Sequence, residues 1–162
     1  MTDLLRSPGR PGVFGALLDE CARATIEMCE LVESISEGAF LEDRESSDPD
    51  TVSLRSICTH CVNAAYGYSS FIRKVLEMEP GANGRLGATD LKSPMEFRGQ
   101  MKRALQHTED SIEPLLAMTD EEASKLTSPV SWGPTYDPEM ILEHGIVHIL
   151  RHRRQIERWN RK

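Results

Sequence analysis

Apolar residues recur at helical spacing in four long segments of this 162-residue chain, and no segment shows the alternation that is typical of a β-strand. The segments cover residues 13–37, 52–79, 93–119 and 137–160. A helix with one apolar face must bury that face, and long amphipathic helices do so most simply against one another. The periodicity therefore predicts an all-α fold, a four-helix bundle.

Local signals predict where these helices begin. Ser93, followed by Pro94 and Glu96, has the spacing of a capping box, and Asp137 before Pro138 is typical of a helix N-terminus. Between the third and fourth helices we expect a long connection, in which Thr119 and Glu122 predict a short helix.

The second half of this connection contains Trp132 and Tyr136 among prolines and a glycine. Long ordered loops in compact domains often carry function, but aromatic residues in a crossover can also simply cover the bundle. Both interpretations stay open at the level of sequence.

Length and composition narrow the class of protein. A chain of this size is expected to form a single domain over residues 1–162, with a flexible N-terminal segment over residues 1–12. A net charge of −7 argues against a nucleic-acid partner. With no apolar run long enough for a membrane span or a secretory leader, and too few cysteines for a disulfide framework, we expect a cytoplasmic protein with reduced thiols.

Three of the five histidines, His144, His148 and His152, follow one another at four-residue intervals on the last predicted helix. Adjacent members lie about 6 Å apart along the axis, and two imidazoles can bridge that span on one ion, whereas all three cannot. His152 falls within the apolar arc and His148 at its border, so the pattern favours these two as metal ligands. Chance spacing, with a histidine buried in the core, is the alternative.

A metal site needs a further ligand from another helix. His60 lies at the flank of the apolar stripe of the second helix, whereas His107 is expected to lie off the apolar face of the third helix, in solvent. His60 is therefore the better candidate. Two ligands on one helix and one on a facing helix are a usual way to build a metal site inside a bundle.

The stretch "HILRHRRQI", residues 148–156, resembles the His-x-x-x-His-Arg-x-Gln-Ile signature in the last helix of the DinB/YfiT-like superfamily. The stretch "SLRSICTHCVNAA", residues 53–65, is similar to the second helix of that family, which supplies its first histidine. The resemblance implies a four-helix bundle that holds a divalent metal with His60, His148 and His152. Members often have glycine where this chain has Arg154, a change that affects packing more than ligation.

The same resemblance implies several functions. Relatives include thiol transferases and isomerases that use a low-molecular-weight thiol, and metal-dependent hydrolases. Homodimers are common among these relatives, so the resemblance also implies a homodimer. We therefore expect a small-molecule substrate and an ion, Zn or Ni first and Mn or Fe as alternatives, that activates a thiol or a water molecule. A non-catalytic dimeric bundle with a structural or vestigial metal site, acting in binding or stress response, is the second hypothesis.

Other reactive residues receive weaker interpretations. The "CTHC" stretch, with Cys58 and Cys61, permits a redox sensor, but both residues lie in the apolar stripe and favour a core role, as do Cys21 and Cys29. The basic C-terminal run fits either a carboxylate site or the helix dipole. Glu143 points away from the histidines, and His144 is either a group near the site mouth or a surface residue. Four aromatic residues are candidates for a pocket wall: Tyr66, Tyr68, Trp132 and Tyr136.

Overall fold

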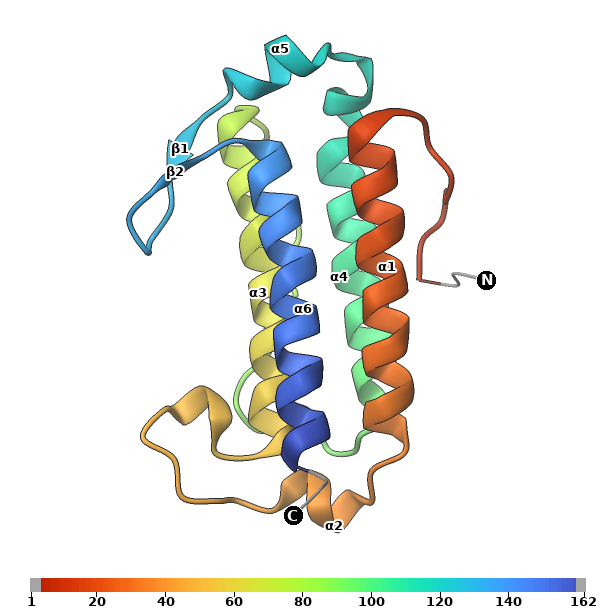
Figure 1. Cartoon of the computed structure of the whole chain (residues 1–162), viewed down its shortest axis with the longest axis vertical. Coiled ribbons are helices and arrows are strands. Elements are labelled where there is room, and N and C mark those ends of the chain that lie inside the picture. Colours follow the sequence, from red (N-terminus) through yellow and green to blue (C-terminus); the bar gives the residue numbers. More distant parts are fainter. Residues whose placement is uncertain (1–3, 160–162) are drawn as a thin grey trace.

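The four predicted helices are present, and they pack as a bundle (Figure 1). In this computed structural model, which describes residues 4–159, the long helices are α1 (Gly12–Glu33), α3 (Leu54–Val75), α4 (Glu96–Ile112) and α6 (Pro138–Trp159). Helices α1, α3 and α4 end before their predicted segments do, because the chain turns before the apolar pattern ends. None of the helices in the described residues has an apolar stretch long enough to cross a bilayer.

The order of the helices around the bundle explains its longest loop. Helix α6 packs against α1 and α3, and α4 packs against the other sides of the same two helices. Helices α3 and α4 run in the same direction, opposite to α1 and α6 (Figure 1). Parallel neighbours require a connection that returns along their length, and residues 76–95 form it.

The other connections hold short elements. The turn expected after α1 contains the short helix α2 (Glu37–Leu41) and the 3₁₀ helix η1 (Pro49–Thr51). The predicted long connection before α6 contains the elements α5 (Asp120–Ser124), β1 (Ser128–Pro129) and β2 (Thr135–Tyr136). The 3₁₀ helix η2 (Glu113–Ala117) precedes them and lies within the segment predicted as the end of the third helix. Strands β1 and β2 form a small antiparallel hairpin that the helical prediction missed, since two-residue strands are too short for a visible alternation.

Two of the three predicted helix caps are confirmed. The Thr119 side chain accepts a hydrogen bond from the Glu122 backbone N–H in a capping box, and Asp137 Oδ1 accepts one from the N–H of Met140 at 2.9 Å. The Ser93 capping box is wrong. Ser93 and its neighbours form a turn, α4 begins at Glu96 without a side-chain cap, and the Glu96 carboxylate instead accepts from the N–H of Lys92.

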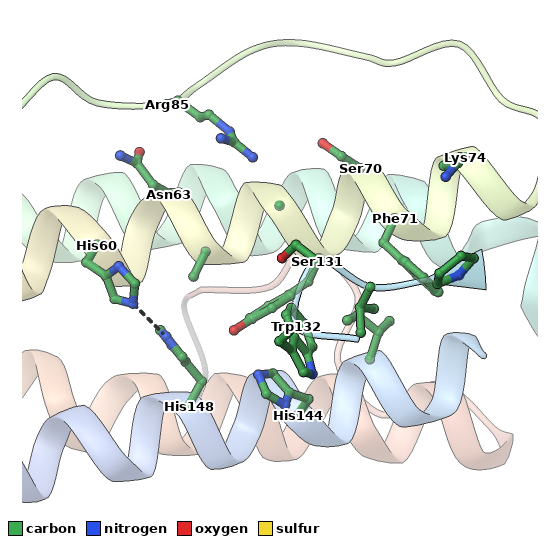
Figure 2. Close-up of a pocket in the computed structure, with 16 residues that line it drawn as sticks. His60, Asn63, Ser70, Phe71, Lys74, Arg85, Ser131, Trp132, His144 and His148 are labelled. Carbon is green, nitrogen blue, oxygen red and sulfur yellow. Dashed lines mark hydrogen bonds between the residues drawn. The ribbon is translucent and has the colours of Figure 1, made fainter. Parts of the chain in front are cut away.

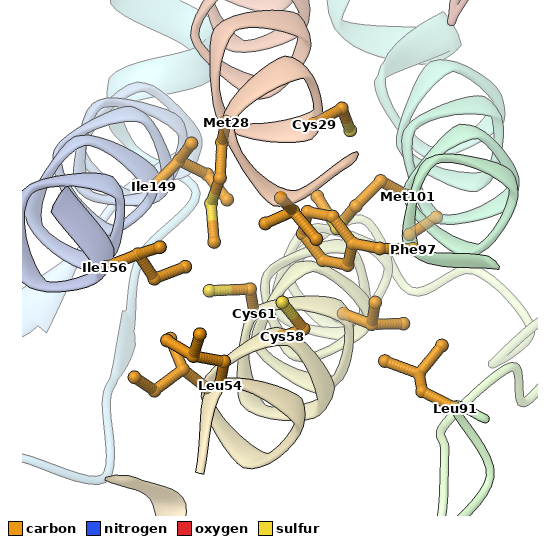
Figure 3. Close-up of a cluster of buried hydrophobic side chains, with 14 of the residues drawn as sticks. Met28, Cys29, Leu54, Cys58, Cys61, Leu91, Phe97, Met101, Ile149 and Ile156 are labelled. Carbon is orange, nitrogen blue, oxygen red and sulfur yellow. The ribbon is translucent and has the colours of Figure 1, made fainter. Parts of the chain in front are cut away.

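The cysteines of the "CTHC" stretch belong to the core. Cys58 and Cys61 are fully buried in a cluster with Met28 of α1, Phe97 of α4 and Ile156 of α6 (Figure 3). Burial raises the pKa of both thiols well above the ordinary value. A thiol that stays protonated at neutral pH is a poor nucleophile, so the core interpretation is the better one.

The N-terminal segment, expected to be flexible, packs against the bundle from Leu4 onward. Leu4 and Leu5 are buried, and the backbone N–H groups of Arg6 and Ser7 each donate to the carboxylate of Glu109 at 2.9 Å. The side chain of Glu109 is only 1% exposed, and the guanidinium groups of Arg6 and Arg10 form ion pairs with its carboxylate. A buried carboxylate requires such donors, and this one ties the segment to α4.

We expect Glu109→Gln to lower the free energy of unfolding by about 2 kcal/mol. The carboxylate accepts from two backbone N–H groups, and the NH₂ group of a glutamine amide would face one of these donors without a hydrogen bond. Glu113→Gln is the matched control: Glu113 is 66% exposed and pairs with Arg10, so its loss is expected to cost about 0.5 kcal/mol or less. Urea unfolding measures both. Equal effects of the two substitutions would contradict the anchoring role of Glu109.

Candidate metal centre

Helices α3 and α6 bring three histidines together. His60 from α3 faces His148 and His152 from α6, and ligand atoms of all three lie within 4.8 Å of one another. The Nε2 atoms of His60 and His148 are 2.9 Å apart, and those of His148 and His152 are 3.2 Å apart. The candidate ligands from the sequence are therefore neighbours in space, and each presents the same ring nitrogen to a common centre.

The outer nitrogens of two rings are held by hydrogen-bond acceptors. Nδ1 of His60 lies 3.0 Å from Oδ2 of Asp50 in η1, and Nδ1 of His152 lies 2.9 Å from Oε1 of Gln155. An acceptor at Nδ1 places the proton there and leaves the lone pair on Nε2, the arrangement typical of metal-bound histidine. His148 differs, because its Nδ1 is buried without a hydrogen-bond partner among the described residues.

The spacing of the nitrogens fits a metal ion. Two imidazole nitrogens at about 2.0 to 2.1 Å from one ion lie about 2.9 to 3.4 Å apart, depending on the coordination angle. The observed separations of 2.9 and 3.2 Å fall in this range. The donor set also fits Zn, Ni, Mn or Fe, all of which accept neutral imidazole.

His148 and His152 are neutral at physiological pH. Burial, reinforced by the neighbouring imidazoles, lowers the pKa of His148 to about 3, and burial also lowers the pKa of His152. Neutral rings do not repel a cation, and Nε2 atoms as close as 2.9 and 3.2 Å need a proton or a cation between them. A divalent ion at the centre would meet this requirement for all three rings.

One side of the cluster opens into a cavity of about 630 Å³ between α3, α6 and the β1–β2 hairpin (Figure 2). We call it the aromatic cavity; its walls include Tyr68, Phe71, Trp132 and His144. Trp132 stacks on His144, with ring centroids 4.6 Å apart and an angle of 19° between the planes. The hairpin thus supplies one wall of a space that ends at His60 and His148.

The other side opens into a second cavity of about 800 Å³, which we call the arginine cavity. Arg151, Arg154 and Arg158 of α6 line it, opposite Asp48 and Asp50. His60 and His148 line both cavities, so the cluster lies between an apolar space and a charged one. These three arginines belong to the basic C-terminal run of the sequence. Arg161 and Lys162 of the same run lie outside the described residues.

The remaining sequence candidates have different places. His107, expected in solvent, is half-buried beside Tyr66, and burial lowers its pKa. His144 is neither a ligand nor a plain surface residue, since it forms part of the aromatic cavity. Glu143 is exposed, as expected, and has no part in the cluster.

Two of the four aromatic candidates, Tyr68 and Trp132, line the aromatic cavity. Tyr136 packs edge-on against Trp132, and Tyr66 lies under the 76–95 loop, where a Cβ on Gly84 would clash with its hydroxyl. The aromatic connection therefore reaches the site, which the sequence left open.

Sequence reasoning missed Asp50, Gln155 and the cavity residue Arg85. Gln155 had a local signal, because it follows His152 by three residues on the same helix. Asp50 and Arg85 had none, since both lie in irregular segments that only the folded chain brings to α3. Comparison of the chain with protein-family models gives no match, and comparison with curated proteins gives none either.

We expect the purified protein to bind about one divalent ion per chain, and His148→Ala or His60→Ala to abolish this binding, since two imidazoles alone hold an ion weakly. Asp50→Ala is expected to weaken affinity roughly 10- to 100-fold through loss of ring orientation. Elemental analysis and competition with a chromogenic chelator measure both.

His107→Ala and Cys58→Ala serve as controls that leave metal content unchanged. An ion that persists after all three substitutions at His60, His148 and His152 would show that the site is elsewhere.

Proposed function

We propose that this protein is a metal-dependent enzyme of the DinB/YfiT-like superfamily, which activates a thiol or a water molecule for attack on a small-molecule substrate. The observation that carries the proposal is the convergence of three Nε2 atoms, two of them with their outer nitrogens held by Asp50 and Gln155. The bundle and the quoted signature support the family assignment.

An open coordination position favours catalysis over a structural role. Structural zinc sites are closed by four protein ligands, whereas catalytic sites keep a position for water or substrate. Among residues 4–159, the group of metal-binding side chains consists of His60, His148 and His152, with no fourth member. The two cavities that meet at this group provide access for a substrate and a second reactant.

The residues of the chain have separable tasks in this proposal. The three histidines bind the ion, and Asp50 and Gln155 fix the ring tautomers. Tyr68 and Trp132 keep bulk water from the substrate side. A divalent ion held here would supply a lowered pKa to a bound thiol or water molecule. Zn or Ni suits the imidazole set best, with Mn or Fe as alternatives.

A low-molecular-weight thiol is the second reactant that we favour. Such thiols are abundant in the reducing cytoplasm, where the protein is proposed to act. They also carry carboxylates, and the arginine cavity offers Arg151, Arg154 and Arg158 without an ion-pair partner among the described residues. The charge of this cavity is the observation that favours a transferase over a hydrolase.

The other functions are less well supported. A structural or vestigial site in a non-catalytic bundle would not need cavities on both sides of the ion. A cysteine-based sensor would need reactive thiols, whereas burial keeps Cys58 and Cys61 protonated.

Cobalt substitution tests the open position. We expect Co²⁺-loaded protein titrated with L-cysteine to gain a sulfur-to-cobalt absorption band in the near ultraviolet that saturates with the thiol, because the thiol enters the free position. L-Serine, which lacks the sulfur, serves as the control and gives no such band. Bound cobalt that shows no spectral response to the thiol would mean a closed sphere and would favour the structural alternative.

A further inference from the structure

Arg85 is an exposed cation without a counter-ion among the described residues. Its guanidinium has no hydrogen-bond or ion-pair partner within residues 4–159, although it lines the aromatic cavity. It comes from the irregular 76–95 loop and reaches toward α3 between Asn63 and Ser70 (Figure 2). Unpaired surface arginines are common, so the question is whether the fold positions this one.

Contacts of the neighbouring residues Gly84 and Leu86 fix the backbone at Arg85. The Asn63 side chain forms a pair of hydrogen bonds with the backbone of Leu86, donating at 3.0 Å and accepting at 2.7 Å. On the other side, Gly84 lies against the Tyr66 hydroxyl so closely that a Cβ would lie 2.0 Å from it. A Cβ on Gly67 would lie 3.4 Å from Nη2 of Arg85, so the guanidinium lies directly over the α3 backbone.

The cavity around Arg85 is positive and largely apolar. Lys74 adds a second cation, which also donates to Ser128 Oγ of the hairpin, and no acidic residue lines the space. The whole chain has a net charge of −7, whereas cations and no carboxylates line this cavity. The local positive potential therefore attracts anions. Tyr68, Phe71 and Trp132 offer flat apolar surface beside it.

We propose that the aromatic cavity binds a small molecule with an apolar body and a carboxylate, and that Arg85 pairs with the carboxylate. Gly67, beneath the guanidinium, follows His60 by seven residues, about 10 Å along the helix. The acid group and the reacting group of the substrate are therefore separated by roughly this distance. The position of the reacting group rests on the proposed function, whereas the pairing of the carboxylate with Arg85 does not.

Phenylalkanoic acids of increasing chain length and their neutral amides test this inference by isothermal titration calorimetry. We expect at least one acid to bind about tenfold more tightly than its amide, since a charge-assisted hydrogen bond separates them. Arg85→Gln is expected to remove the preference while leaving amide affinity within twofold. Arg55→Gln, the same change at the start of α3 and outside this cavity, should keep the preference.

Measurements on His152→Ala protein separate this inference from the metal proposal, because His152 belongs to the metal group but does not line the aromatic cavity. The Arg85-dependent preference must persist without the ion. Equal binding of acids and amides by the native chain would overturn the inference. So would an equal loss of preference in the Arg55→Gln control, or the absence of binding by every acid at millimolar concentration.

Discussion

The meeting of three imidazole Nε2 atoms between α3 and α6 is the constraint around which this molecule is organised. Ring nitrogens 2.9 and 3.2 Å apart repel one another unless a proton or a cation lies between them. Packing of α3 on α6 holds them there, and Asp50 and Gln155 keep two of the rings turned inward. The local stability of the bundle and the candidate chemistry are thus linked through one contact between two helices.

The direction of the helices has a consequence for the site. Because α3 and α4 are parallel neighbours, the chain must return along their length, and the 76–95 loop passes over α3 (Figure 1). Asn63 and Gly67 of α3 are then available to hold this loop close, and Arg85 reaches the cavity from it. The connection that these parallel helices require therefore brings a charged side chain, Arg85, to the cavity.

The β1–β2 hairpin before α6 also brings a side chain to the site. The loop between its strands bears Trp132, which stacks on His144 one helical turn above His148. Lys74 ties the hairpin to α3 through Ser128, so the aromatic wall is fixed to both helices that supply the histidines. One face of α6 consequently turns toward the histidine cluster and the two cavities that meet there.

Helical periodicity determined the four long helices and the burial of Cys58 and Cys61, because spacing along one helix fixes which side chains share a face. It also favoured the three histidines that meet, which the family resemblance joined as one set of ligands. The Ser93 cap was wrong and His107 was misplaced, since both depend on how irregular segments turn and what they cover. Asp50, Arg85 and the placement of Trp132 were decided by tertiary structure. These residues lie outside long helices, where no period relates sequence position to direction, and only packing against α3 and α6 brings them to the site.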